Sequence, residues 1–371
     1  MSDDFIFTSE SVTTGHPDKL CDQVSDAVVD RFLEQDPNSS IVAECAISSG
    51  VLFISAHYAS QARLDIPDVA RRVIRDVGYS KDVFDADACT VLTSFMDHTA
   101  SDYRPIDLGK MKDAEIARIT AKHQVTAFGY ACDHTESLIP LPIYLAHKLA
   151  GRLDSAEVQK ALPYLLPDGQ SQVGIEFKDG QPNRIHSIAL IASQTDTGAV
   201  DPDRLRSDLV DLVIDPVLKG ESFKADGKTG IFVNPEGPVI GGGPAAHSGL
   251  TGRKTGIDTY GEYARHSGAA LSGKDPFRID RVGAYAARYA AKNIVAAGAR
   301  VSMCRGRGRI RSTRLNRLGV WILSLHWRRR GRGFRTRKRG SLQLFAPSIS
   351  TGTGLADQRS QNSPFIFFAP M

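Results

Sequence analysis

The chain has 371 residues, of which 42% are hydrophobic, and it carries 46 Lys and Arg residues against 42 Asp and Glu residues. This composition excludes a disordered chain and supplies enough apolar side chains for two or three compact units. No stretch is long and apolar enough to span a membrane, the opening "MSDDFIF" lacks a secretory signal, and the five cysteines form no CxxC pair. We therefore expect a cytoplasmic protein without disulfides or structural zinc.

The net charge of +4 hides a sharp change near residue 300. Residues 300–371 contain 16 of the Lys and Arg residues, a single acid at Asp357, and both tryptophans of the chain. The residues before this point are acidic on balance. Such a break in composition indicates two regions of different origin or role.

The first part of the chain predicts a helix, a hairpin, a second helix and a strand. Apolar residues at helical spacing after Pro17 predict a helix over 17–35. The alternating stretch "IVAECAISSGVLFISAHYA" predicts a hairpin that turns at Ser49-Gly50. A helix over about 67–77 and a buried strand near 88–94 follow.

The same order of elements then occurs a second time. A helix is predicted over about 138–151, a hairpin turns around Asp179-Gly180, a helix spans about 202–217, and a strand covers 230–234. This repeat predicts an α+β fold of related modules, each a mixed sheet covered on one face by helices.

A third copy begins but is not completed. The stretch "RIDRVGAYAARYAAKNIVAAG" predicts a helix that ends at Gly298, and no alternating pattern follows it. We expect the third module to lack its sheet, and the chain beyond about residue 300 to be disordered or poorly soluble. The predicted organisation is a first module at 4–102, a mobile active-site loop at 103–122, a central module at 123–243, the start of a third module at 244–299, and a basic tail at 300–371.

Two polar clusters are candidates for chemistry. The first is His16, Asp18 and Lys19, at the start of the first predicted helix. The carboxylate there could simply offset the helix dipole, or the free amides, imidazole and cation could bind a phosphate chain with its metal. The second is a glycine-rich segment over 241–281, which is either a solvated surface loop or a second part of an anion site. The charged residues in it that could form such a site are Arg253, Lys254, Asp258, Lys274, Asp275, Arg278, Asp280 and Arg281.

Longer motifs decide between these alternatives by resemblance. The stretches "FTSESVTTGHPDKLCDQVSDAVVDRFLEQDP", "FGYACDHTE", "FVNPEGPVIGGGP", "GLTGRK", "DTYG" and "ARHSGAALSGKDP" closely resemble the methionine adenosyltransferases, or S-adenosylmethionine synthetases, over residues 5–298. The resemblance implies three α+β modules related by a pseudo-threefold axis. It also implies homodimers or homotetramers with active sites between subunits, and formation of S-adenosylmethionine from ATP and methionine with release of phosphate and diphosphate. Membrane and nucleic-acid partners are not expected.

The resemblance also implies roles for individual residues. In the family the methionine sulfur attacks the 5′ carbon of ATP, so the site must stabilise a highly charged triphosphate leaving group. The matching positions are His16 at the bridging oxygen, Asp18 and Asp280 as Mg²⁺ ligands, Glu44 at a K⁺ site, Asp168 at the nucleoside, and Arg253, Lys254 and Lys274 at the triphosphate.

The sequence departs from the family pattern at several of these sites. A catalytic lysine of the family is Gln170 here, a later lysine is Arg278, and an adenine-stacking aromatic residue is Val239. Three groups that clasp the amino-acid end of methionine are replaced by imidazoles at His57, His98 and His123, and a fourth acid at the substrate is replaced by His247. Three interpretations remain open. The substrate is another thioether or is held differently, the first three histidines form a transition-metal site, or the site has drifted in an inactive nucleotide-binding paralogue.

The basic tail also has two interpretations. Its Arg-Gly repeats and tryptophans could bind nucleic acid through phosphate contacts and stacking. Alternatively, the tail is an out-of-frame translation of a normal third module. In support of this second interpretation, residues 303–311 can be back-translated so that a one-base shift gives an alternating, strand-like nonapeptide.

Overall fold

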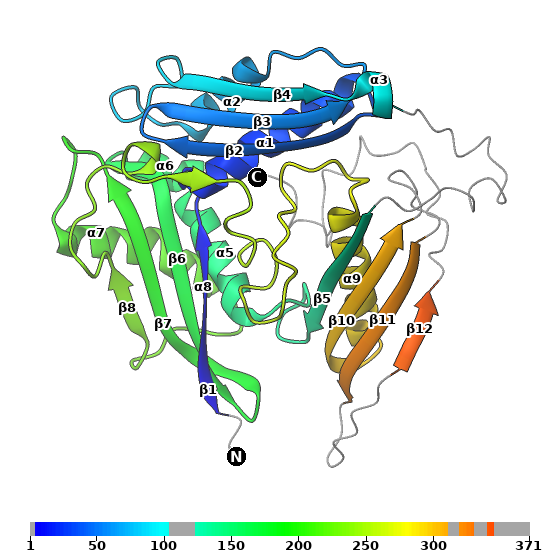
Figure 1. The fold of residues 1–371 in the computed structure, drawn as a ribbon. Coiled ribbons are helices and arrows are strands. Elements are labelled where there is room, and N and C mark those ends of the chain that lie inside the picture. Colours follow the sequence, from blue (N-terminus) through cyan, green and yellow to red (C-terminus); the bar gives the residue numbers. More distant parts are fainter. Residues whose placement is uncertain (1–3, 104–122, 311–318, 330–339, 345–371) are drawn as a thin grey trace. The chain divides into compact units, whose positions relative to one another are not determined.

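The computed structural model describes residues 4–103, 123–310, 319–329 and 340–344 (Figure 1). For residues 123 and 124 and for those after 298 only the backbone is described. The chain divides into two compact units. The first contains the described residues up to 103 together with 139–263 and 272–274, and the second contains the other described residues. No helix of the described part of the chain is long and apolar enough to cross a membrane.

One sheet of the first unit has the strand order β4-β3-β2-β9 (Figure 1). Its strands are β2 (Ser40–Ser48), β3 (Val51–Ala59), β4 (Thr90–Asp97) and β9 (Gly249–Leu250). The helices α1 (Pro17–Gln35) and α2 (Ile66–Val77) pack on one face, where Leu20, Val24, Ile41, Ile54 and Ile74 form a buried core. A short helix, α3 (Thr99–Asp102), follows β4.

The other sheet of the first unit has the order β1-β6-β7-β8. Its strands are β1 (Phe5–Val12), β6 (Leu165–Lys178), β7 (Gln181–Gln194) and β8 (Gly230–Val233). Its helical segments are α5 (Leu141–Leu153), α6 (Ala156–Ala161), α7 (Pro202–Leu209), the π-helical η2 (Val210–Ile214) and α8 (Asp215–Lys219), with the short 3₁₀ turn η3 (Gly243–Ala245) further on. The fully buried Phe177 stacks on Phe5 with ring centroids 4.7 Å apart, which ties β1 to the core of this sheet.

The second unit contains a third sheet, with the order β12-β11-β10-β5. Its elements are β5 (His123–Cys132), α9 (Ile279–Ala296), β10 (Ala299–Ile310), β11 (Gly319–Arg329) and β12 (Gly340–Leu344). The prediction that no sheet follows the third module's helix is therefore wrong for the backbone. The prediction relied on the lack of alternating apolar and polar side chains. Strand pairing, however, uses backbone N–H and C=O groups, which an Arg-Gly sequence still supplies. Within the unit, Val282 is partly buried against the α9 core, and Tyr289 remains 66% exposed.

Each sheet takes one strand from a distant part of the sequence. β1 pairs with β6, with Phe5 opposite Phe177. β5 pairs with β10, and β9 pairs with β2 through Ala46 and Leu250. The other three strands of the first two sheets, β2–β4 and β6–β8, are the hairpin and strand of the two predicted copies of helix, hairpin, helix and strand.

The α+β prediction and most predicted elements are confirmed. The helix at 17–35 agrees with α1, and the turns at Ser49-Gly50 and Asp179-Gly180 lie between the strands of the two predicted hairpins. Asp179 and Gly180 both have positive φ, at 50° and 69°, which suits a tight hairpin turn. Of the mobile loop predicted at 103–122, residues 104–122 lie outside the described part of the chain.

Candidate active site

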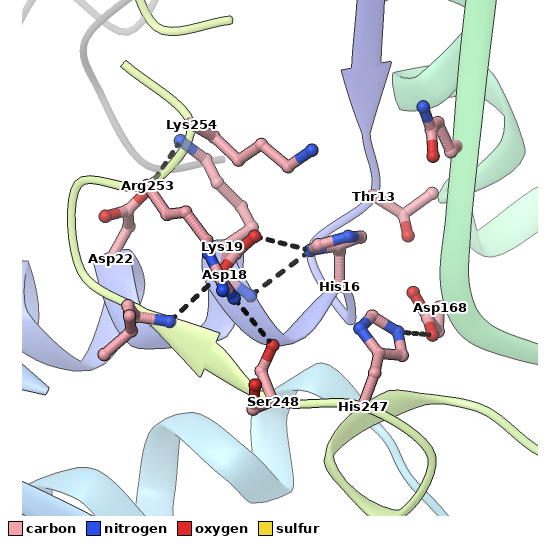
Figure 2. A network of polar contacts seen from close by, with 12 residues as sticks. Thr13, His16, Asp18, Lys19, Asp22, Asp168, His247, Ser248, Arg253 and Lys254 are labelled. Carbon is pink, nitrogen blue, oxygen red and sulfur yellow. Dashed lines mark hydrogen bonds and ion pairs between the residues drawn. The ribbon is translucent and has the colours of Figure 1, made fainter. Parts of the chain in front are cut away.

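A junction between β1 and β6 brings the start of α1 to the centre of the first unit. Thr13 follows β1, and its Oγ1 donates to the Pro167 carbonyl at 2.6 Å and accepts the Gly169 N–H at 2.7 Å. The Thr13 N–H in turn donates to the Gly169 carbonyl at 3.0 Å. These bonds fix His16 and Asp168, which come from segments about 150 residues apart, in one place (Figure 2).

His16 is the N-cap of α1, and Pro17 occupies the first helical position. Its Nδ1 accepts the Asp18 N–H at 3.2 Å, so the neutral ring carries its proton on Nε2. Only 12% of the side chain is exposed, and this burial lowers the pKa of His16 to about 4, against the influence of Asp168 and Asp18. The imidazole is therefore a neutral Nε2–H donor near pH 7.

The glycine-rich segment lies directly on the start of α1. The Asp18 side chain is buried, and its Oδ1 accepts the Leu250 N–H at 3.0 Å and the Arg253 Nη1–H at 3.3 Å. A side chain at Gly249 would place its Cβ 2.1 Å from the Pro17 carbonyl oxygen, so only glycine permits this approach. The first cluster thus meets the part of the glycine-rich segment that contains Arg253, with Asp18 and Arg253 paired as Figure 2 shows.

The next residue of α1 forms a partly buried charge pair. The Lys19 Nζ lies 2.8 Å from Asp258 Oδ1 and 3.7 Å from Asp22 Oδ2. Desolvation raises the pKa of Asp22 to about 7, with Lys19 opposing the rise. Lys19 therefore links α1 to the segment that carries Arg253, and its ammonium group is paired with two carboxylates of the protein.

Glu10 connects two of the predicted site residues. Its Oε1 accepts a hydrogen bond from Lys254 Nζ at 3.0 Å, and its Oε2 accepts one from the Gln170 amide at 2.7 Å. Glu10 lies on β1 and Gln170 on β6, where β1 and β6 are paired. The position where the family has a lysine is thus a neutral amide held against a carboxylate that already binds one cation.

Asp168 and His247 form a second pair beside His16. Asp168 Oδ2 accepts the Gly243 N–H at 2.7 Å and lies 2.8 Å from His247 Nε2. This hydrogen bond raises the pKa of His247 above its usual value. The rings of His16 and His247 meet edge to face, with centroids 5.0 Å apart. His247, a predicted contact of the amino-acid substrate, is therefore directed to the nucleoside acid.

Other predicted residues of the first unit lie on the sheet that contains β2. Lys274 forms an isolated bridge with Val42 beside β2, and Glu44 is exposed on β2. His57 on β3 and His98 after β4 lie together, with ring centroids 5.9 Å apart. The roles of these four residues at the substrates remain predictions.

Three predicted residues belong to the second unit. Arg278 is the N-cap residue of α9, and its Nε lies 3.4 Å from Asp275 Oδ2. Asp280 is in the first turn of α9. His123 is the first residue of β5, and its side chain lies outside the described part of the chain.

Sequence reasoning missed Glu10, Thr13 and Gly243. Thr13 and Gly243 act through hydrogen bonds to residues that are 75 or more positions away in the sequence. Glu10 and Gln170 lie on one face of the β1–β6 pair, but this pairing joins strands about 160 residues apart. The register of such a pair is not readable from either strand alone, so the signal for these residues was absent.

Stability should depend on pH through the partly buried His147. Its Nδ1 lies 2.9 Å from Ser11 Oγ, and desolvation lowers the pKa of His147 to about 4. Between about pH 6.5 and pH 4 the unfolded state binds a proton that the folded state does not, so stability falls as the pH falls. We expect the stability advantage of wild type over H147Q to shrink by about 1–2 kcal/mol between pH 7 and pH 5.

Denaturant unfolding of both proteins at the two pH values measures this difference. Comparison with H147Q cancels the contributions of His16, whose pKa is also lowered, and of Asp22, whose raised pKa acts in the opposite direction. Equal pH slopes for the two proteins would contradict the prediction.

Comparison with known proteins assigns the chain to a family. Residues 4–100, 118–239 and 240–304 match the models of the N-terminal, central and C-terminal domains of S-adenosylmethionine synthetase. The chain is also 43% identical over 308 residues to an S-adenosylmethionine synthase of Thermosynechococcus vestitus, covering 79% of this chain and 74% of that relative. The three domains match in the family's order, and the first helix and the glycine-rich segment meet at one site. The chain therefore belongs to the S-adenosylmethionine synthetase family.

Proposed function

We propose that the chain is a methionine adenosyltransferase, which forms S-adenosylmethionine from ATP and L-methionine and releases phosphate and diphosphate. The observation that carries this proposal is the meeting of His16 and Asp18 with Arg253 and Lys254 at the N-terminus of α1. Free amides at a helix start attract anions, and two cations and a neutral imidazole donor beside them suit a triphosphate. Family membership supplies the reaction that such a site would serve.

The residues of the site divide the work as follows. The sulfur of methionine attacks the 5′ carbon, and charge develops on the triphosphate as the carbon–oxygen bond breaks. Nε2–H of His16 would donate to the bridging oxygen, while Arg253 and Lys254 would stabilise the leaving chain. Before ATP binds, Glu10 would hold Lys254 in place through their hydrogen bond. When the triphosphate binds, Lys254 would leave Glu10 and contact a phosphate oxygen.

The donor set at Asp18 fits a magnesium ion. Its Oδ1 accepts two hydrogen bonds, and its Oδ2 lies 3.9 Å from His16 Nδ1. A carboxylate oxygen is the ligand type that Mg²⁺ prefers. We propose Asp18 and Asp280 as its ligands and Glu44 as the K⁺ carboxylate. Bound Mg²⁺ would supply charge neutralisation of the triphosphate.

Incubation of the protein with Mg²⁺, K⁺, ATP and methionine, followed by mass analysis of the products, tests the function. S-adenosylmethionine together with diphosphate and phosphate supports the proposal. A second candidate is an inactive nucleotide-binding subunit, which the neutral Gln170 favours. It is distinguished by ATP binding without any product, also when other thioethers replace methionine.

We also propose that the protein is cytoplasmic and acts as a homodimer or homotetramer. Four described cysteines are buried free thiols, as expected in a reducing compartment. The face of β2–β4 opposite α1 and α2 exposes Val51, Phe53, Leu92 and Met96, each by 42–51%. An apolar sheet face of this kind supports a contact between subunits.

A charge on this face should dissociate the oligomer. F53K would place an ammonium in the apolar face, and we expect light scattering to give a smaller mass for this variant than for wild type. F232K is a matched control, because Phe232 is similarly exposed, at 49%, on the sheet that contains β8. A monomeric wild type, or equal masses for all three proteins, contradicts the proposed surface.

A further inference from the structure

Three side chains beside the proposed phosphate corner form a compact set of metal-binding groups. They are His16, Asp168 and His247, here called the His–Asp–His cluster, and their ligand atoms all lie within 4.8 Å of one another. His247 Nε2 is 2.8 Å from Asp168 Oδ2, and the two imidazole rings have centroids 5.0 Å apart. Figure 2 shows His16 and His247 from different segments beside the same carboxylate.

The chemistry of this cluster differs from that of the magnesium site. Two imidazoles and one carboxylate form the ligand set of many zinc sites with an open fourth position, whereas Mg²⁺ prefers oxygen ligands alone. We propose that the His–Asp–His cluster binds Zn²⁺ or a similar transition-metal ion. This binding rests on the three side chains themselves and not on the proposed reaction.

The surroundings hold the three ligands in place. Asp168 is fixed by the Gly243 N–H and by the neighbouring Thr13–Gly169 bonds, and His16 is fixed as the cap of α1. The His247 side chain is 43% exposed, which gives an ion a route to the cluster. Two ligand atoms about 2.0–2.2 Å from a tetrahedral zinc ion are roughly 3.3 Å apart. His247 and Asp168 therefore need to separate by only about half an ångström from their present 2.8 Å.

His16 can adopt the required tautomer at the loss of one capping hydrogen bond. Ligation through Nε2 moves the ring proton to Nδ1, which lies 3.9 Å from Asp18 Oδ2. A small rotation turns this contact into a hydrogen bond from the imidazole to a carboxylate. Metal-bound histidines commonly have such a carboxylate partner, which fixes the tautomer.

Occupation of the cluster would exclude nucleotide if the proposed function is correct. Zn²⁺ would engage His16 and Asp168, the groups proposed to face the bridging oxygen and the nucleoside. The ion would therefore act as an inhibitor that competes with ATP. This competition, unlike the binding itself, depends on the proposed function.

Zinc binding to metal-free full-length protein can be measured by competition with a chromophoric chelator. We expect one Zn²⁺ per chain, at least tenfold weaker binding in both H247A and H247Q, and unchanged binding in the control H266A. The glutamine variant retains a hydrogen-bond donor toward Asp168 but has no imidazole, so it separates metal ligation from packing. His266 is an exposed histidine whose Nδ1 accepts the nearby Gly268 N–H.

Co²⁺ provides a second measurement on the same variants. Four-coordinate Co²⁺ gives strong visible absorption bands, and we expect these bands in wild type and H266A but not in H247Q. Wild type that binds no more Zn²⁺ than H247A, or H247Q with undiminished affinity, overturns the proposal.

A non-hydrolysable ATP analogue with excess Mg²⁺ then separates the two claims. Displacement of Zn²⁺ by the analogue supports both the metal site and the placement of ATP. Binding that depends on His247 but is unaffected by the analogue supports the metal site and contradicts the proposed nucleotide position.

Discussion

Replacement of Asp18 by asparagine is expected to lower kcat/KM for ATP by about 100-fold or more, with little change in the fold. The asparagine oxygen can still accept the Leu250 N–H, so the contact between α1 and the glycine-rich segment survives. The change removes the negative charge that pairs with Arg253 and is proposed to bind Mg²⁺. Loss of that charge weakens the metal and leaves the guanidinium without its carboxylate.

Steady-state kinetics over a range of Mg²⁺ concentrations measures this effect, and higher Mg²⁺ should recover part of the activity. D87N is the matched control, because Asp87 is an exposed carboxylate paired with Arg75 at 2.9 Å. Exposed ion pairs contribute little to stability, so D87N should behave as wild type. An active D18N with normal Mg²⁺ dependence would exclude Asp18 from the magnesium site.

Q170K is expected to raise kcat by about tenfold or more, because it restores a cation where the family has a lysine. The new ammonium would lie beside Glu10 Oε2, which now accepts the Gln170 amide at 2.7 Å. Glu10 offers one oxygen to each of two cations, so the positive charge can be accommodated beside Lys254. The negative charge that develops on the leaving triphosphate would then be stabilised by one additional cation.

Q159K controls for the added charge, since Gln159 lies on α6, where its amide donates to the Leu153 carbonyl at 3.2 Å, and the change should leave kcat unchanged. Product formation by wild type and both variants, measured at saturating ATP, separates the two positions. A rate for Q170K no higher than that of wild type, or an equal gain in Q159K, would show that position 170 does not limit the reaction.

Local patterns predicted most of the elements because their signals lie within a few residues. The helical spacing after Pro17 gave the bounds of α1, and positive-φ turn residues marked the hairpin at Asp179-Gly180. The meeting of Asp18 with Arg253 followed from family motifs, since no local signal links residues 235 positions apart. Glu10 escaped prediction because its partners depend on the register of β1 against β6.

In the C-terminal part of the chain, the sequence analysis failed to predict strands that the structure contains. Arginine and glycine in β10 hide a strand from any test based on side-chain alternation, although its backbone pairs with β5 over ten positions. The family match ends at residue 304, close to the change in composition at residue 300. This end of the match agrees with the hypothesis that the tail is read out of frame.

The exchange of strands between sheets has a consequence for how the protein is made. The ribosome releases β1 well before its partner β6, which begins about 150 residues later. At rates of about 5–20 residues per second, this N-terminal strand stays without its sheet for roughly 10–30 seconds. A nascent chain with an unpaired apolar edge is prone to aggregate or to bind chaperones, so the opening segment is under a constraint during synthesis that no isolated module would face.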